Sequence, residues 1–315
     1  MRRLVLTRVL LAVPILLGVS VVAFVLMRAL PGDYAQVQAG VTSEVSEETL
    51  ESIRRSLGLD IPLWQQYLGW LGDALQGDLG SSFARKTSVT AEIAERLGVT
   101  LELTLIAVVM AIFLGVTTGL LSARLRGSAE WFVRTLNVLG AAIPNFVIAT
   151  LIVLLVGLYA PTVPIFGFRA LSVDPAANLQ SLLLPALALA MSMAVTISEN
   201  TRASVLEVEN MDYVKVARAK GMAPGVILRR YLVRNALTPV LTVTGVQVAA
   251  LLGGSIIIET IFGIPGLGQL LFSAVNTRDY PVLQGVVLVV ATIVVLVNML
   301  VDIGYAKVDA RVRDE

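Results

Sequence analysis

Long runs of apolar residues without a single charge dominate the pattern of hydrophobic and polar positions along the chain. A helix needs about 20 largely apolar residues to cross the hydrocarbon core, because its backbone groups must be hydrogen-bonded within the segment there. Six runs meet this condition and predict an all-α membrane protein with six transmembrane helices. The predicted spans are Val9–Met27, Leu103–Ala123, Leu136–Ala160, Pro175–Ser198, Asn235–Ile258 and Pro281–Val301.

Two of these runs need interpretation at their ends. The first follows three arginines and is followed by "RALPGD" rather than a small-residue cleavage site, so it predicts a retained helix and not a signal peptide. The third run continues as far as Phe168. Pro161 and Pro164 interrupt it, and "PTVPIFGF" therefore predicts a turn after the span.

The polar stretch between the first two spans predicts two short amphipathic helices. One begins after Ser46 and ends at Gly58, and the other carries an apolar and aromatic face from Trp64 to Leu75. Two interpretations stay open for this stretch: a lid that covers the helix bundle, or a contact surface for substrate or receptor. The candidate contacts on that side are Trp64, Tyr67, Trp70, Pro265 and Gly266.

Small residues recur inside two spans. Gly115 and Gly119 form a GxxxG pattern, and Gly253, Gly254 and Ser255 cluster in the fifth span. Small side chains let helices approach closely where lipid offers no hydrophobic drive. We expect packing within the chain here, rather than a dimer seam, because GxxxG alone is weak evidence for dimerisation.

Composition narrows the chemistry that the chain can perform. Apolar residues make up 56% of the 315 residues and charged residues 15%, as expected of a membrane protein. The absence of both Cys and His excludes disulfides, thiolate or imidazole metal sites and Ser-His or Cys-His nucleophiles. The net charge of +1 gives no case for nucleic-acid binding.

The positions of the basic residues predict the orientation in the membrane. With the N-terminus inside, the inner segments hold sixteen Lys and Arg, whereas the two short outer loops hold only Arg169 and Arg278. The long stretch between the first two spans is discounted, because long loops cross largely regardless of charge. Both termini are therefore predicted to be cytoplasmic.

The polar residues and motifs disfavour an ion-coupled carrier and a transporter with an ATPase in the same chain. Glu102, Glu259 and Asp302 lie at span ends, so no ionisable residue occupies a predicted span centre, where ion-coupled carriers place them. A GxxxxGK[ST] nucleotide-binding loop is absent, so the chain itself is not predicted to be an ATPase. The glycine-rich "GIPGLGQ" is best explained as a tight turn. An intramembrane hydrolase built on Ser255 lacks a base.

A basic stretch between the fourth and fifth spans, "DYVKVARAKGMAPGVILRRYLVRNALTP", is the most distinctive segment. Asp212 is predicted to cap a short helix, Gly221 to end it, and Pro224 to begin a second helix through Leu232. The small residues Ala217, Ala219 and Gly221 would let a partner's surface approach the backbone. A loop that only orients the chain needs basic residues but no pair of helices.

At these residues the chain resembles the membrane subunits of binding-protein-dependent ABC importers, in the dipeptide, oligopeptide and nickel permease branch. Their cytoplasmic loop carries the pattern Glu-Ala-Ala, followed by three residues of any type and then Gly. When Gly221 is aligned with that Gly, Lys215, Val216 and Ala217 occupy the first three positions, and only the second Ala of the pattern is present, as Ala217. The resemblance extends to "ALPGDYA", "LGLDIPLWQQYLGWLGDALQGDLGSSF", "IAERLGVTLELTL" and "ETIFGIPGLGQLLFSAVNTRDYPVLQGVVL", and so covers nearly the whole chain. Tyr34 and Ala310 depart from the usual pattern locally.

The resemblance implies a type I importer permease in the cytoplasmic (inner) membrane of a prokaryote. It would pair with a second homologous permease, two ABC ATPase subunits and an extracytoplasmic solute-binding protein. ATP and Mg would bind the ATPase partners, and this chain would bind no cofactor and no metal. Short peptides are the expected substrate, with nickel chelates or other small solutes as alternatives. A stand-alone channel or secondary carrier is the alternative from another class. The implied ATPase-coupling residues are Asp212, Tyr213, Lys215, Ala217, Arg218, Ala219, Lys220, Gly221, Arg234 and Asn235.

These predictions divide the chain into three parts. Residues 1–30 hold the N-terminus and the first span, and residues 31–98 form the extracytoplasmic helical segment. Residues 99–315 form a five-helix permease core with a cytoplasmic coupling loop at 199–238.

Overall fold

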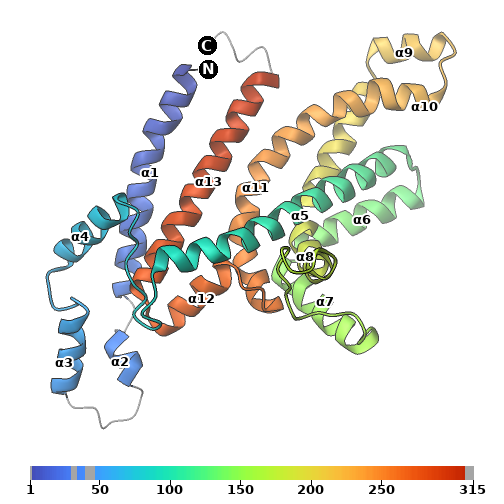
Figure 1. The fold of residues 1–315 in the computed structure, drawn as a ribbon. Coiled ribbons are helices and arrows are strands. Elements are labelled where there is room, and N and C mark those ends of the chain that lie inside the picture. The colour runs from blue at the N-terminus through green and yellow to red at the C-terminus, as the bar shows by residue number, and fades with distance from the viewer. Residues whose placement is uncertain (1, 30–33, 40–46, 309–315) are drawn as a thin grey trace. The chain divides into compact units, whose positions relative to one another are not determined.

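The computed structural model describes residues 2–29, 34–39 and 47–308, and every regular element in these ranges is a helix (Figure 1). The predicted all-α architecture is therefore confirmed. In chain order the helices are α1 (Arg2–Ala29), α2 (Tyr34–Ala39), α3 (Glu47–Ser56), α4 (Leu63–Leu75), α5 (Val89–Arg124), α6 (Ser128–Ala142), α7 (Asn145–Tyr159), α8 (Pro175–Glu209), α9 (Asp212–Ala219), α10 (Pro224–Ile227), the π-helix η1 (Leu228–Val233), α11 (Arg234–Phe262), α12 (Leu267–Thr277) and α13 (Tyr280–Val308).

Five single helices of the described chain are long and apolar enough to cross a membrane. These candidate spans are Leu6–Ala29, Val89–Arg124, Pro175–Glu209, Val243–Phe262 and Tyr280–Ile303. The pair α6 and α7 passes the same test when its two helices are taken together. The described chain thus has five such spans, or the six that the sequence predicts if α6 and α7 form one broken span.

The third span is not the single helix predicted over Leu136–Ala160. The chain bends by 105° between α6 and α7, at Ile143 and Pro144. Proline lacks the backbone N–H of a helix interior, and its ring pushes the preceding residue out of the helical region. Ile143 accordingly has extended dihedrals, φ −87° and ψ 121°. The hydropathy pattern continues through this break and does not report it.

The contacts divide the chain into two compact units. One unit comprises Met1–Thr100 with Pro265–Met299, and the other comprises Leu101–Ile264 with Leu300–Glu315. Two of the three boundaries fall inside α5 and α13, and the third lies between α11 and α12. The predicted three-part division concerns the two sides of a membrane and stays a prediction.

The first unit contains the two short helices that the amphipathic pattern predicts, α3 and α4. Gly58 ends α3 in the left-handed region with φ +64°, where L-residues are disfavoured. The backbone N–H groups of Gly58 and Leu59 donate to the carbonyl oxygens of Arg55 and Arg54, respectively. The predicted cap Ser46 lies outside the described residues. An apolar core joins α1, α5, α12 and α13 in this unit through Met27, Val89, Leu270 and Val282.

The second unit is organised around α8, and α5 packs against α8 through the GxxxG glycines. A Cβ at Gly115 would lie 2.6 Å from the Ala194 carbonyl oxygen, and one at Gly119 would lie 2.6 Å from that of Ser198. The expected packing within the chain is confirmed. Gly119 lies four residues after Gly115 on α5, and Ser198 lies four residues after Ala194 on α8. The contacts therefore advance in the same sense along both helices, and α5 and α8 run in the same direction. The α6–α7 pair must therefore carry the chain back between them.

Polar side chains also tie the helices of the second unit together. Ser198 on α8 accepts hydrogen bonds from Thr118 on α5 (3.0 Å) and Asn137 on α6 (3.0 Å). Gln247 on α11 donates to Thr196 on α8 at 3.2 Å. Such interhelical bonds satisfy polar groups away from water and define the pairing of the helices. Ser255 donates to the Leu252 carbonyl of its own helix.

Candidate functional site

The basic segment after α8 folds as a short helix, as the sequence predicts, although its capping differs. Asp212 is the first residue of α9 rather than its cap; Met211 precedes the helix and provides no capping side chain. The Asp212 carboxylate instead accepts from the Lys215 ammonium at 3.0 Å. Both side chains of this pair are exposed, so the pair contributes little to stability.

Gly221 ends α9 in the conformation that its sequence position predicts. It has φ +73°, and its N–H donates to the Arg218 carbonyl at 2.9 Å. The N–H of Met222 donates to the Ala217 carbonyl at 3.2 Å. These two bonds form a Schellman motif, in which a left-handed residue satisfies the last carbonyls of the helix. A Cβ at Gly221 would meet no atom within 4 Å, so the backbone conformation alone requires glycine here.

The second helix of the segment is not a separate helix that ends near Leu232. Pro224 begins α10 at its first position, as predicted, but α10 passes through the π-helix η1 directly into α11. Single turns of π-helix are often found at functional sites, where they change the register of a helix. Residues 224–262 thus form one helical path from α10 into the membrane span.

The short helix α9 has one buried and one exposed side. Val214 and Ala217 are buried in a small apolar cluster with residues of α8, α10 and η1, namely Val205, Val208, Ile227 and Leu232. Tyr213, Val216 and Lys220 are exposed at positions i, i+3 and i+7, and we call these three residues the open face of α9. Tyr213 is 45% exposed and Val216 is 52% exposed. Tyr213 and Val216 thus lie one turn apart on the exposed side of the helix, opposite the buried Val214 and Ala217.

The other predicted coupling residues lie around this helix. Ala219 and Gly221 are exposed beside the open face, whereas Ala217 is buried and packs against the chain's own core. Arg218 forms an ion pair with Glu209 at the end of α8. Arg234 and Asn235 begin α11, and their side chains lie outside the described residues.

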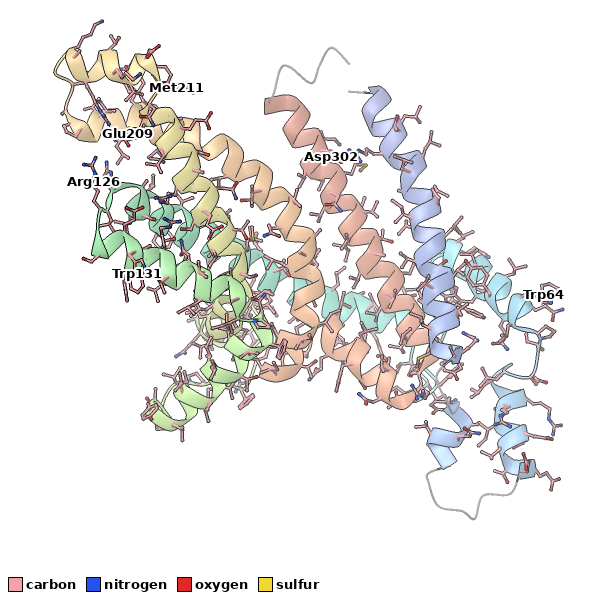
Figure 2. All side chains as sticks on the ribbon, turned by 180° about the vertical axis from the view of Figure 1, so that it is seen from behind. Trp64, Arg126, Trp131, Glu209, Met211 and Asp302 are labelled. Carbon is pink, nitrogen blue, oxygen red and sulfur yellow. The ribbon has the colours of Figure 1, made fainter. Side chains whose placement is uncertain are left out.

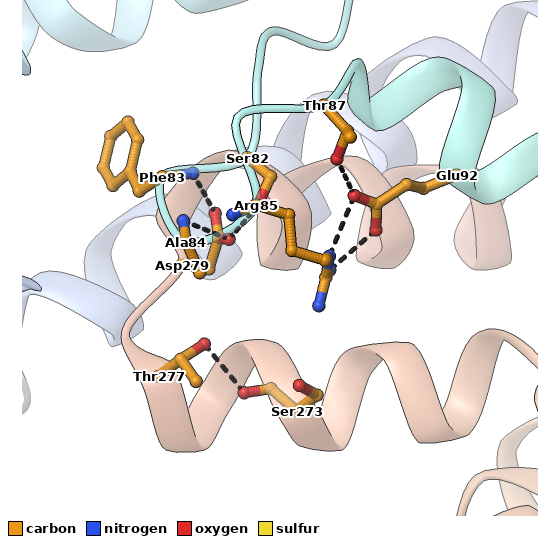
Figure 3. Close-up of polar contacts among 9 residues, drawn as sticks. All are labelled: Ser82, Phe83, Ala84, Arg85, Thr87, Glu92, Ser273, Thr277 and Asp279. Atoms are coloured by element: carbon orange, nitrogen blue, oxygen red, sulfur yellow. Dashed lines mark hydrogen bonds and ion pairs between the residues drawn. The ribbon is translucent and has the colours of Figure 1, made fainter.

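A second constellation surrounds Asp279, a residue that the sequence analysis did not single out. Asp279 is fully buried at the corner between α12 and α13. Its carboxylate accepts from the Ser82 hydroxyl at 2.5 Å and from the backbone N–H groups of Phe83 at 3.0 Å and Ala84 at 3.2 Å (Figure 3). Three donors on one carboxylate make a strong anchor, because hydrogen bonds to a charged group are roughly twice as strong as neutral ones. We call residues 77–88 the Asp279 loop.

The Asp279 loop is further held by its own backbone and by its neighbours. A bridge between Ser81 and Ser88 closes it, and Arg85 pairs with Glu92 at the start of α5. Tyr34 donates from its hydroxyl to the Phe83 carbonyl at 2.8 Å. Burial, with a smaller contribution from the Asp279 charge, raises the pKa of Tyr34.

Two non-glycine residues with left-handed backbone belong to this constellation. Lys86 has φ 60° and lies in the loop, and Arg278 has φ 55° and directly precedes Asp279. Such conformations cost about 1 kcal/mol or more for residues with a Cβ, so surrounding contacts must hold them. Residues 82 and 279 come from two stretches quoted above for the family resemblance. Their place in stretches that resemble the family was the one indication in the sequence that these residues matter. Spacing along the chain cannot show that residues 197 positions apart are in contact.

The candidate receptor-side residues lie in different environments. Trp64 is 63% exposed, whereas the Tyr67 hydroxyl hydrogen-bonds with Ser20 of α1 at 2.8 Å and its ring meets Phe24 edge-on. Trp70 packs beside Tyr67 and is partly buried. Pro265 is partly buried and Gly266 is buried. Of these residues, Trp64 presents the largest open surface.

Comparison with known protein families matches the chain along nearly its whole length. Residues 111–314 match the family described as "Binding-protein-dependent transport system inner membrane component". Residues 1–104 match its N-terminal counterpart, "Binding-prot-dependent transport system membrane comp, N-term". The chain belongs to this family. Members are multi-pass proteins of the inner membrane and are the permease subunits of ABC importers, which work with a partner permease, ATPase subunits and a binding protein.

Two curated relatives cover nearly all of the chain. A protein of Brucella abortus (strain 2308), named "Putative peptide transport system permease protein", is 42% identical over 99% of each chain. The "Dipeptide transport system permease protein DppB" of Alkalihalophilus pseudofirmus is 36% identical and covers 97% of this chain and 98% of its own. Full-length similarity to both places this permease in the peptide branch of the family.

Solved structures share the fold at low sequence identity. A chain of the MetNI methionine ABC transporter, in an inward-facing conformation, aligns with a TM-score of 0.57 at 19% identity, over 69% of this chain and 96% of its own. A chain of an amino acid ABC transporter aligns with a TM-score of 0.51 at 18% identity, over 69% and 94%. The fold is therefore that of a type I ABC importer permease.

Proposed function

We propose that this permease forms half of the translocation path for short peptides in an ATP-driven importer. The peptide substrate is supported by the names of the relatives that match the chain from end to end. In this proposal an extracytoplasmic binding protein delivers the peptide, and two ATPase subunits bind and hydrolyse ATP with Mg. The chain itself contributes no nucleotide site and binds no cofactor, in keeping with the lack of a nucleotide-binding loop in its sequence.

The open face of α9 is the observation that carries the coupling part of the proposal. Val214 and Ala217 fix α9 to the ends of α8 and α10, while Tyr213 and Val216 remain exposed. An ATPase that binds Tyr213 and Val216 would therefore contact a helix that packs on α8 and on the helical path from α10 into α11. Movement of the ATPase would reach α8 through the cluster and α11 through η1. The energy must come from contacts that differ between the nucleotide states.

The proposed orientation has both termini and α9 in the cytoplasm. It is supported by the sixteen basic residues of the inner segments against two in the short outer loops. The Asp279 loop and α4 then face the extracytoplasmic side, where the binding protein would dock. Trp64 and the exposed residues of the Asp279 loop would be available to that partner.

A charge placed on the open face tests ATPase docking. Val216→Glu should insert and pair with the second permease but lose ATPase co-purification and peptide uptake, because a carboxylate would have to be buried without a partner. Val226→Glu on α10 is the matched control, since Val226 is 45% exposed and lies off the open face. Equal loss of the ATPase in both variants would contradict docking on α9.

Uptake by the assembled complex tests the substrate. Proteoliposomes that contain both permeases, the ATPases and the binding protein should accumulate a labelled dipeptide only with ATP. Accumulation of a nickel chelate without dipeptide uptake would contradict the peptide assignment. Transport by this chain alone, without ATP, would contradict the importer itself.

A further inference from the structure

A cavity of about 430 Å³ lies between the end of α5, the end of α8 and the α9–η1 segment. Its apolar lining, which we call the floor, consists of Ala123, Val205, Met222, Pro224, Ile227 and Leu232. Its remaining wall carries charge, from Arg124, Arg126, Arg218 and Glu209. Figure 2 shows Arg126 and Glu209 at the end of the second unit that also holds α9. The lining of the cavity thus combines apolar and charged side chains.

The charges of this cavity are not balanced within the described chain. Arg218 is paired with Glu209, but none of the described residues forms a hydrogen bond or ion pair with Arg124 or Arg126. The residues that line the cavity thus include three arginines and a single carboxylate, and Arg124 and Arg126 are exposed. Arginine is the side chain best suited to phosphate, because its planar donors match the phosphate oxygens in pairs. The excess of positive charge favours an anion that carries no ammonium group of its own.

The position of the cavity along α5 indicates the source of such an anion. The charge-free run of α5, Leu103–Ala123, is about 31 Å long at about 1.5 Å per residue, close to the hydrocarbon thickness of about 30 Å. Arg124 is the first residue beyond this run, and Arg126 follows it closely. In a membrane that this run spans, both arginines would lie near the level of the lipid phosphates. The contacts between α5 and α8 place Val205 near the same level.

We propose that this cavity binds the phosphodiester headgroup of an anionic phospholipid such as phosphatidylglycerol. Arg124 and Arg126 would hold the phosphate oxygens, and the apolar floor would receive the glycerol and the first carbons of the acyl chains. The headgroup would bridge α5 to the α9–η1 segment, because Met222, Ile227 and Leu232 of that segment form the floor. The lipid would thereby be a structural ligand of the element that we propose couples to the ATPase.

The test compares two charge-neutralising pairs in the complete complex. Arg124→Gln with Arg126→Gln removes the unpaired arginines of the cavity, and Arg229→Gln with Arg230→Gln removes two exposed arginines of the same segment that do not line it. Purified complexes are titrated with phosphatidylglycerol or phosphatidylcholine, and native mass spectrometry counts the retained lipid. With about 1 kcal/mol for each basic residue at a lipid surface, the first pair should weaken phosphatidylglycerol retention about 30-fold.

The outcomes distinguish binding in this cavity from non-specific electrostatic attraction between anionic lipid and basic residues. Loss in the first pair alone, with phosphatidylcholine binding unchanged, supports the site. Equal loss in both pairs, or loss in neither, overturns it. Displacement of the lipid by the same concentration of inorganic phosphate would show a small-anion site instead. Loss of the ATPase subunit with phosphatidylglycerol retained would show that the arginines bind the partner protein.

Discussion

The Asp279 loop and the α9–η1 segment both connect long helices, but they are held in place by opposite means. The Asp279 loop is anchored by polar groups: a buried carboxylate accepts three hydrogen bonds, and two non-glycine residues are held in left-handed conformations around it. The α9–η1 segment is anchored by a small apolar cluster and ends its helix with a glycine that fits its conformation without strain.

The difference indicates what each segment needs from a partner. A loop whose polar groups are already satisfied by its own chain has a defined shape before anything binds. A helix that buries Val214 and Ala217 while exposing Tyr213 and Val216 is only half covered. The first segment has a defined shape within the chain itself, whereas the second leaves Tyr213 and Val216 exposed, where we propose that the ATPase binds. Substitutions in each segment should therefore fail in different assays.

The largest effect is expected for Asp279→Ala. The substitution leaves the Ser82 hydroxyl and two backbone N–H groups without their shared acceptor, and a loss of about 3 kcal/mol or more in unfolding free energy follows. Thermal unfolding of the purified complex in lipid nanodiscs measures this as a lowered midpoint. Binding-protein-stimulated ATP hydrolysis should fall as well, because the loop loses its shape.

Asp78→Ala is the matched control for this prediction. Asp78 belongs to the same loop and accepts one hydrogen bond, from the Gly80 N–H at 2.8 Å, but it is exposed. Its loss should cost less than about 1 kcal/mol, because water replaces the partner. Similar midpoints for the two variants would show that Asp279 is not the anchor of the loop.

A smaller effect on stability, with a larger effect on transport, is expected for Gly221→Leu. At φ +73° a Cβ costs about 1 to 2 kcal/mol, although the space around it within the chain is open. The variant should insert and pair with the second permease but lose uptake, because the end of α9 shifts and the side chain obstructs the docked ATPase. Uptake, ATPase rate and subunit co-purification are measured on one membrane preparation.

Gly225→Leu separates the two causes. Gly225 is exposed in α10, has no atom within 4 Å of its added Cβ and does not have a positive φ. Leucine is also the better helix former, so this variant should keep normal uptake and stability. If both leucine variants transport normally, Gly221 serves only to end the helix, and the coupling contact lies elsewhere.

The sequence predicts the parts of the molecule that depend on local pattern. Six apolar runs, the helix end at Gly221, the start of α10 at Pro224 and the amphipathic helices α3 and α4 follow from hydropathy, glycine and proline alone. The bend at Pro144 was missed because hydropathy continues through it, even though the proline itself gives the local signal. The polar anchor between Ser82 and Asp279 depends on two distant segments meeting in space, which no local pattern encodes.

The smallest effect is expected for Lys215→Cys, which also tests the orientation. The Lys215 side chain is 63% exposed, and its one ion pair among the described residues is with the exposed Asp212. Its loss should therefore change stability by less than about 0.5 kcal/mol and leave uptake intact. Because the chain has no other cysteine, a membrane-impermeant maleimide reports one position at a time. Lys215→Cys should be labelled only after the cytoplasmic side is opened, whereas Asn276→Cys, at an exposed position of α12, should be labelled on intact cells once the outer barrier is permeable to the reagent. The reverse pattern would place α9 outside and would remove the basis for ATPase docking on its open face.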